Sequence, residues 1–160
     1  NMMLSEQEIV SLDSKGIKVP KGDEFFSLED ALNKAHKYVN KAIVVKPKST
    51  NFGLGISIFK EGPQVEDIQE AFKLAFEHDN TVLVEEFIKG REFSVGVLDG
   101  KSLAPIEIKP LKGFYDYENK YQSNMTLEIC PADITSEQDT LLKENTEKET
   151  EEKRVNMFYF

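Results

Sequence analysis

The sequence predicts an α+β fold in which helices pack on a largely antiparallel sheet. Residues 28–39 and 65–76 carry apolar side chains at the three-to-four spacing of an amphipathic helix. Asp99-Gly100 is a typical two-residue hairpin turn between two strand-like runs. Further short runs, either apolar or alternating, are typical of strands and lie at 42–45, 56–58, 81–87 and 93–97.

The first elements carry recognisable ends. Ser5 and Glu8 have the spacing of a capping box, and Gly16 follows where that helix would end. The stretch "IKVPKGDEF" then reads as an extended connector. Ser27 and Asp30 predict the N-terminus of the second helix. We therefore expect two helices before the first buried strand.

The second half of the chain changes character. A third helix follows Pro63, and "LAPIEIKP" returns as the partner of the preceding strand. After residue 135 the segment "SEQDTLLKENTEKETEEKR" is crowded with charge, and its only aliphatic residues are Leu141 and Leu142. A helix here has almost no apolar face to bury, so we expect it to be frayed or disordered. A strand-like run, "VNMFYF", comes last. We therefore divide the chain into a main part, 1–135, and a C-terminal part of polar helix and final strand, 136–160. We also expect the chain to be a piece of a longer protein.

Charge, cysteine content and hydropathy exclude several classes of partner and location. The formal net charge of −9 argues against a nucleic acid or an anionic membrane as the main partner, because binding either needs a positive field. Cys130 is the only cysteine, so no intrachain disulfide can form, which fits a reducing compartment. No apolar run reaches transmembrane length and no signal peptide is recognisable. We expect a cytoplasmic protein.

The stretch "KAIVVKPKSTNFGLGISIFK", residues 41–60, places a lysine at the end of a buried strand and two glycines in the following loop. Backbone N–H groups of small residues can converge on a phosphate, and Lys46 could add a fixed cation. A plain hairpin would use Gly53 and Gly55 equally well. The order of residues excludes the Walker loop, the dinucleotide-binding fingerprint and the protein-kinase glycine loop.

This stretch, together with "TVLVEEFIKGREF", resembles the ATP-grasp ligases. It is most similar to the glutathione synthetase module of bacterial bifunctional glutathione-forming enzymes, and the resemblance covers about residues 8–135. It implies a fold of two α+β lobes gripping the nucleotide, incomplete at both ends of this chain. It also implies a set of ATP-binding residues: Lys46 on phosphate, the loop residues Ser49, Thr50, Gly53 and Gly55, the adenine-holding Glu85, Glu86, Phe87 and Ile88, and Glu92 on the ribose hydroxyls.

A second motif concerns the acceptor substrate. The stretch "GFYDYENKY", residues 113–121, followed by "EICPAD", closely resembles the D-alanine–D-alanine ligases of the same superfamily. An aromatic loop packed on the sheet is the plainer alternative. By the resemblance, Lys120 would reach the γ-phosphate of ATP and Tyr121 would face the acceptor amino acid. A cation at that point stabilises charge that develops during phosphoryl transfer.

Two positions depart from the family pattern. Ile9 and Val10 stand where members usually carry a further nucleotide-contacting lysine. In "RVNMFYF", Arg154 matches the family's catalytic arginine, but Asn156 replaces a magnesium-binding aspartate. A neutral amide is a poorer ligand than a carboxylate for a hard dication. The following strand, with further metal ligands, and the family's N-terminal domain lie outside this chain.

The resemblance thus implies an ATP- and Mg-dependent ligase that joins a carboxylate to an amine through an acyl phosphate. Because the acceptor loop decides the acceptor, we expect a D-alanine–D-alanine ligase-like enzyme or a fragment of one. A glutathione synthetase-type module and a catalytically inactive ATP-binding module are the alternatives. The expected partners are an amino acid or short peptide and either a missing N-terminal domain or a second copy.

Overall fold

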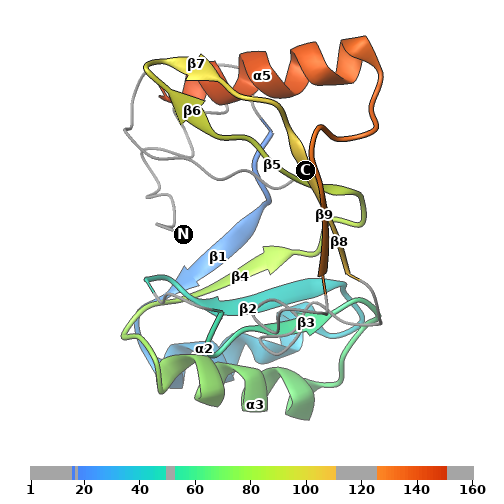
Figure 1. The fold of residues 1–160 in the computed structure, drawn as a ribbon. Helices are drawn as coiled ribbons and strands as arrows, with labels where there is room; N and C mark the ends of the chain where they lie inside the picture. Colours follow the sequence, from blue (N-terminus) through green and yellow to red (C-terminus); the bar gives the residue numbers. More distant parts are fainter. Residues whose placement is uncertain (1–15, 17, 50–52, 111–125, 151–160) are drawn as a thin grey trace. The chain divides into compact units, whose positions relative to one another are not determined.

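The computed structural model describes residues 16, 18–49, 53–110 and 126–150 (Figure 1). The described residues form two compact units. Among the described residues, the first unit is Pro20–Ile88, and the second comprises 16, 18–19, 89–110 and 126–150. The division by composition at residue 135 remains a prediction. The helix expected within residues 5–16 and the strand expected at 154–160 lie outside the described residues.

A four-stranded antiparallel sheet forms the first unit. Its strand order is β1-β4-β2-β3. The strands are β1 (Gly22–Phe25), β2 (Ile43–Pro47), β3 (Ser57–Phe59) and β4 (Val82–Glu86). The strands predicted at 42–45, 56–58 and 81–87 are therefore confirmed. The connector predicted before Ser27 also pairs with β4, because an edge strand tolerates polar residues such as Asp23 and Glu24.

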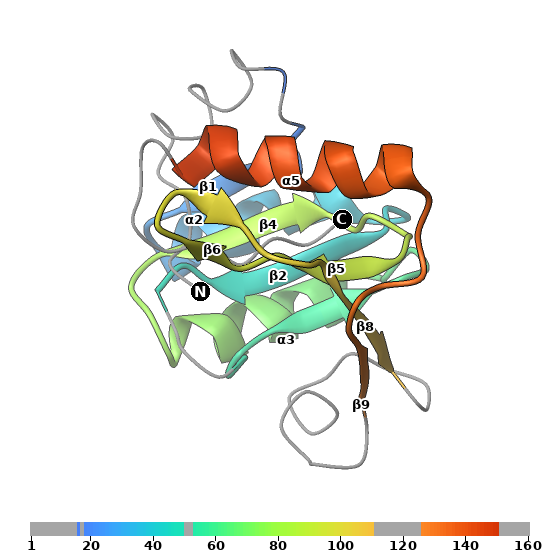
Figure 2. The same ribbon diagram turned by 45° about the horizontal axis from the view of Figure 1, so that its top comes forward.

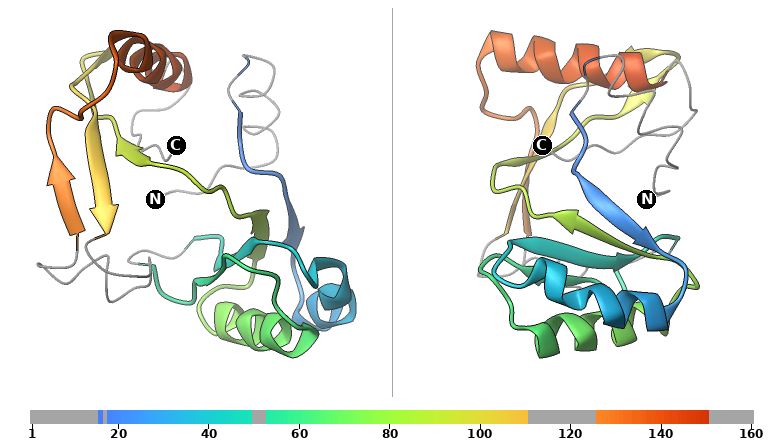
Figure 3. Two further views of the ribbon diagram at one scale, coloured as in Figure 1. Left: turned by 90° about the vertical axis from the view of Figure 1, so that its right-hand side faces the viewer. Right: turned by 180° about the vertical axis from the view of Figure 1, so that it is seen from behind.

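Two helices cover one face of this sheet (Figure 3). Helix α2 (Leu28–Lys34) begins where predicted, since the Ser27 hydroxyl accepts the Asp30 N–H at 3.2 Å, and a 3₁₀ turn, Ala35–Tyr38, continues it. Helix α3 (Val65–Phe76) starts with a capping box in which Gln64 N–H donates to the Asp67 carboxylate at 2.9 Å.

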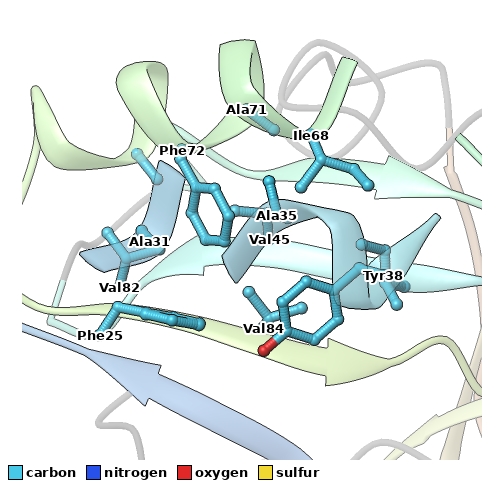
Figure 4. Packing of buried hydrophobic residues seen from close by; sticks show 12 residues of the cluster. Phe25, Ala31, Ala35, Tyr38, Val45, Ile68, Ala71, Phe72, Val82 and Val84 are labelled. Atoms are coloured by element: carbon cyan, nitrogen blue, oxygen red, sulfur yellow. The ribbon is translucent and has the colours of Figure 1, made fainter. Parts of the chain in front are cut away.

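The core of the first unit lies between the sheet and these helices (Figure 4). Phe72 of α3 is fully buried, and its ring centroid lies 5.2 Å from that of Phe25 and 6.4 Å from that of Tyr38, in edge-to-face geometry. The Tyr38 hydroxyl donates to Asp23 of β1. Burial, and then this hydrogen bond to Asp23, raise the pKa of Tyr38. This packing gives β2 and β4 a rigid backing.

The second unit contains a three-stranded antiparallel sheet in the order β5-β8-β9 and a separate hairpin. The sheet strands are β5 (Glu92–Ser94), β8 (Ile106–Pro110) and β9 (Thr126–Ile129), and the hairpin strands are β6 (Val97–Leu98) and β7 (Lys101–Ser102). Asp99 and Gly100 form the hairpin turn with φ of 50° and 78°, as predicted.

Helix α5 (Ser136–Thr150) corrects the expectation of a frayed or disordered segment (Figure 2). Thr135 and Gln138 form a reciprocal capping box, with backbone-to-side-chain distances of 3.0 and 3.2 Å. Leu142 is only 6% exposed and packs with Phe93 and Val95. A single leucine, Leu142, therefore anchors a helix whose composition predicted almost no apolar face.

A polar contact holds the C-terminal end of α5. The Glu147 carboxylate accepts hydrogen bonds from the Ser102 N–H at 2.9 Å and from the Ser102 hydroxyl at 2.7 Å. These bonds lower the pKa of Glu147. Glu147 thus holds the helix against β7, while Leu142 packs on Phe93 and Val95. A count of apolar residues cannot reveal the contact made by the charged side chain.

Candidate functional site

Lys46 lies near the end of β2, on the sheet face that α2 and α3 leave open. Along β2 the side chains at Ile43, Val45 and Pro47 are buried towards the helices, so Val44 and Lys46 point to the opposite face. There the Lys46 ammonium forms an ion pair with the Glu85 carboxylate of β4. The two side chains are 20% and 18% exposed, so water screens this pair only partly.

The open face combines aliphatic and charged groups. Val44 lies opposite Glu85, and Lys46 lies opposite Leu83, which also pairs with Glu24 of β1. A second ion pair joins Glu24 to Lys48. In this register Val44 and Leu83 lie on either side of the Lys46–Glu85 pair, so two aliphatic side chains stand beside a lysine on one sheet face. Such a face can contact a ring and an anionic group together.

The loop that follows β2 begins on a fixed support. Ser49 N–H donates to the Asp79 carboxylate at 2.6 Å, and the other oxygen of Asp79 accepts the Thr81 N–H at 3.2 Å. Lys48 N–H donates to the Thr81 carbonyl at 2.9 Å. The turn between α3 and β4 therefore holds the first residue of the glycine loop.

The same turn supports the far end of the loop. Gly53 and Gly55 both adopt a φ of 73°, in the left-handed region that favours glycine. A Cβ at Gly55 would lie 2.6 Å from His78 Cδ2 and 2.9 Å from Pro47 Cγ, closer than van der Waals contact allows. Only glycine fits there without displacement. Thr50 lies outside the described residues.

The predicted adenine-binding residues form one continuous strand end. Glu86 N–H donates to the Lys21 carbonyl at 2.8 Å, while the Glu86 carboxylate accepts the Lys21 N–H at 3.1 Å. Phe87 N–H donates to the Ala42 carbonyl at 2.9 Å, and Ile88 is 57% exposed. The backbone at residues 86–87 is thus fixed, and Glu85 is the member paired with Lys46.

Glu92 belongs to the second unit, where it begins β5 opposite Ile108. One of its carboxylate oxygens is inaccessible to solvent. The neighbouring Arg91 forms a bidentate pair with Glu107, with Nε and Nη2 each 2.7 Å from a carboxylate oxygen. These hydrogen bonds lower the pKa of Glu107 and raise the pKa of Arg91.

Sequence reasoning missed four of these residues. His78 and Asp79 lie outside the motifs quoted above, and Arg91 lies within "TVLVEEFIKGREF" but was assigned no role. Glu107 carried the one visible signal, since an acid in the strand-like run "LAPIEIKP" needs a cation if it is buried.

Other predicted site residues fall outside the described part of the chain. These are Lys120, Tyr121, Arg154 and Asn156, so their roles stay predictions. Within the described ranges, no cluster of three or more His, Cys, Asp or Glu side chains could hold a metal ion. Among the helices described, none is both long and apolar enough to cross a membrane.

Comparison with known proteins agrees with this arrangement. A family model described as "D-ala D-ala ligase C-terminus" matches residues 13–152. This chain belongs to that family. Both resemblances seen in the sequence are therefore confirmed, as is the ATP-grasp fold class. The family match spans both described units, including the polar segment after residue 135.

Individual relatives are of two kinds. The chain is 53% identical over 88 residues to the glutathione biosynthesis bifunctional protein GshAB of Enterococcus faecalis, covering 55% of this chain and 12% of that protein. It is 42% identical over 95 residues to a D-alanine–D-alanine ligase of Geobacter sulfurreducens, covering 59% and 29%. The VanG D-Ala:D-Ser ligase structure from Enterococcus faecalis superposes with a TM-score of 0.72 and 28% identity, covering 94% and 44%. The chain thus spans less than half of each.

Proposed function

We propose that this chain supplies the ATP-binding part of a D-alanine–D-alanine-type carboxylate–amine ligase. The observation that carries the proposal is the Lys46–Glu85 pair at the edge of an aliphatic sheet face, beside a loop with two left-handed glycines. ATP-grasp membership supports ATP as the nucleotide. An ammonium with little exposure, next to a loop whose backbone turns at two left-handed glycines, suits a triphosphate.

Each part of ATP has a matching group. Lys46 would contact phosphate, and the loop residues Ser49, Thr50, Gly53 and Gly55 would donate backbone N–H groups. Val44 and Leu83 offer an apolar surface to the purine, and the strand end at 85–88 offers polar groups to its edge. Glu92 would accept the ribose hydroxyls.

Three residues would serve the reaction itself. Lys120 would neutralise the γ-phosphate while a substrate carboxylate is phosphorylated, and Tyr121 would position the amine that then attacks the acyl phosphate. Arg154 would stabilise charge at the same centre. When bound, magnesium would neutralise phosphate charge. The resemblance implies Asn156 as a metal ligand, and a neutral amide is a weak one.

The acceptor has two candidates. The loop "FYDYENKY" favours D-alanine, whereas the 53% identity to GshAB over 88 residues favours glutathione synthesis. Asn156 supports a third possibility, an inactive ATP-binding module. The proposed location is the cytoplasm, which supplies ATP and reduced thiols.

Phosphate release in the presence of ATP and magnesium separates these candidates. We expect release that depends on D-alanine from a protein that also supplies the family's N-terminal domain and the following metal-binding strand. Release that depends instead on γ-glutamylcysteine plus glycine would favour the glutathione reaction. Nucleotide binding without any release would favour the inactive module, and absence of nucleotide binding would contradict the proposal as a whole.

A further inference from the structure

An ion pair in the second unit, between the exposed Arg91 guanidinium and the buried Glu107 carboxylate, has no place in the function proposed so far. Glu107 of β8 is 1% exposed, and both of its oxygens accept hydrogen bonds from Arg91 at 2.7 Å. Lys109 approaches the same carboxylate at 3.4 Å. Arg91 also donates to the Asp133 carbonyl at 2.7 Å. Burying a carboxylate is costly unless it is fully paired, so this arrangement demands exact geometry.

The pair lies next to the predicted ribose-binding residue. Arg91 immediately precedes Glu92, and Glu107 lies directly opposite Phe93 in the β5–β8 register. The Arg91 guanidinium also lies 5.0 Å from the Phe93 ring centroid. Side chains alternate along a strand, so Arg91 and Phe93 occupy one face of β5 and Glu92 the other.

This alternation makes the register of β5 critical. A slip by one residue would turn the Glu92 carboxylate to the opposite face. Strand β5 has only three residues, so few ladder hydrogen bonds oppose such a slip. A bidentate contact from Arg91 to Glu107 fixes both distance and orientation at the start of the strand.

We infer that Arg91 and Glu107 are positioning residues, whose pairing holds β5 in the register that presents the Glu92 carboxylate to the two hydroxyls of a ribose. This role rests on the proposed function, since it assumes that Glu92 contacts ribose. A purely structural role would lower affinity for every nucleotide equally. A positioning role specifically lowers the preference for ATP over 2′-deoxy-ATP.

The test compares dissociation constants for ATP and 2′-deoxy-ATP in the full chain. The variants are Glu107→Gln and Arg91→Lys, with Glu92→Gln as the direct test of the ribose contact. Asp139→Asn is the matched control, because Asp139 forms a 2.7 Å ion pair with Lys143 in the same unit, on α5 rather than at β5. Hydrogen exchange of the β5 and β8 amides, measured without nucleotide, reports how firmly the two strands are paired.

We expect the wild type to prefer ATP by about tenfold, the worth of one hydrogen bond to a charged group. Glu92→Gln, Glu107→Gln and Arg91→Lys should each reduce that preference several-fold, and Asp139→Asn should not change it. Exchange of the β5 and β8 amides that are protected in the wild type should rise in the Glu107 and Arg91 variants alone.

The test distinguishes failure of the positioning role from failure of the proposed function. If Glu92→Gln abolishes the preference but Glu107→Gln and Arg91→Lys retain it, the positioning role is wrong and the ribose contact stands. If Glu92→Gln has no effect, or the wild type binds no ATP, the proposed function is contradicted, and the positioning role with it. Unchanged exchange at β5 in Glu107→Gln would also overturn the positioning role.

Discussion

Substituting Gly55 by alanine tests whether the base of the glycine loop is as tightly packed as the structure shows. Two costs are expected. A φ of 73° costs an L-residue about 1–2 kcal/mol. The added Cβ, 2.6 Å from His78 Cδ2 and 2.9 Å from Pro47 Cγ, adds an overpacking cost of about 1–3 kcal/mol. We expect Gly55→Ala to lower the unfolding free energy of the first unit by about 2–5 kcal/mol.

Two controls separate these costs. Gly100 has a φ of 78°, and no atom lies within 4 Å of a Cβ built there, so Gly100→Ala should show the conformational cost alone, about 1–2 kcal/mol. Shortening the neighbour in His78→Ala should relieve part of the clash. The double variant Gly55→Ala/His78→Ala should therefore be less destabilised than the sum of the two single changes.

The slowest-exchanging backbone amides of each unit give its unfolding free energy separately, which suits a chain with two units. Hydrogen exchange read by NMR is thus the assay, with β2 and β4 reporting for Gly55 and with β8 reporting for Gly100. A Gly55→Ala cost no greater than that of Gly100→Ala, or strict additivity with His78→Ala, would refute the steric part of the reasoning.

Two further predictions concern the core and the buried acid. Phe72→Ala should lower the unfolding free energy of the first unit by about 3–5 kcal/mol, because it empties a fully buried site between Phe25 and Tyr38. Leu74→Ala, on the same helix but at a side chain 42% exposed, should cost far less. Urea unfolding measures both. Glu107 has a lowered pKa in the folded state, so its pairing stabilises the second unit above the ordinary carboxyl value of 4.5 and is lost as the pH falls through the folded pKa. Glu107→Gln should therefore flatten the dependence of the unfolding free energy on pH below about 4.5, and an unchanged slope would contradict this pairing.

Local signals in the sequence predicted most of the elements that carry the site. Alternating and apolar runs located β2 and β4, and Asp99-Gly100 located the hairpin, because these patterns depend only on neighbouring residues. The cap at Ser27 was visible for the same reason. Motif order then placed Lys46 at the end of a strand and Gly55 in the loop that follows, and the structure supports both ends of that loop on the α3–β4 turn.

Contacts between distant residues could not be predicted in this way. The ion pair of Lys46 with Glu85 depends on the β2–β4 register, and the pair of Arg91 with Glu107 depends on the β5–β8 register. The sequence presents these residues as isolated charges. Helix α5 was misjudged similarly, since one leucine, Leu142, finds a partner surface on a strand some fifty residues earlier.

Affinity for ATP with magnesium, measured by isothermal titration, tests the central claim most directly. The chain offers a matched pair of variants, since Lys46 and Lys48 each form an ion pair with a glutamate of the first unit. The account predicts that the wild type binds ATP, that Lys46→Ala loses about 1–3 kcal/mol of binding free energy, and that Lys48→Ala loses much less. Equal losses in the two variants, or no binding by the wild type, would contradict it.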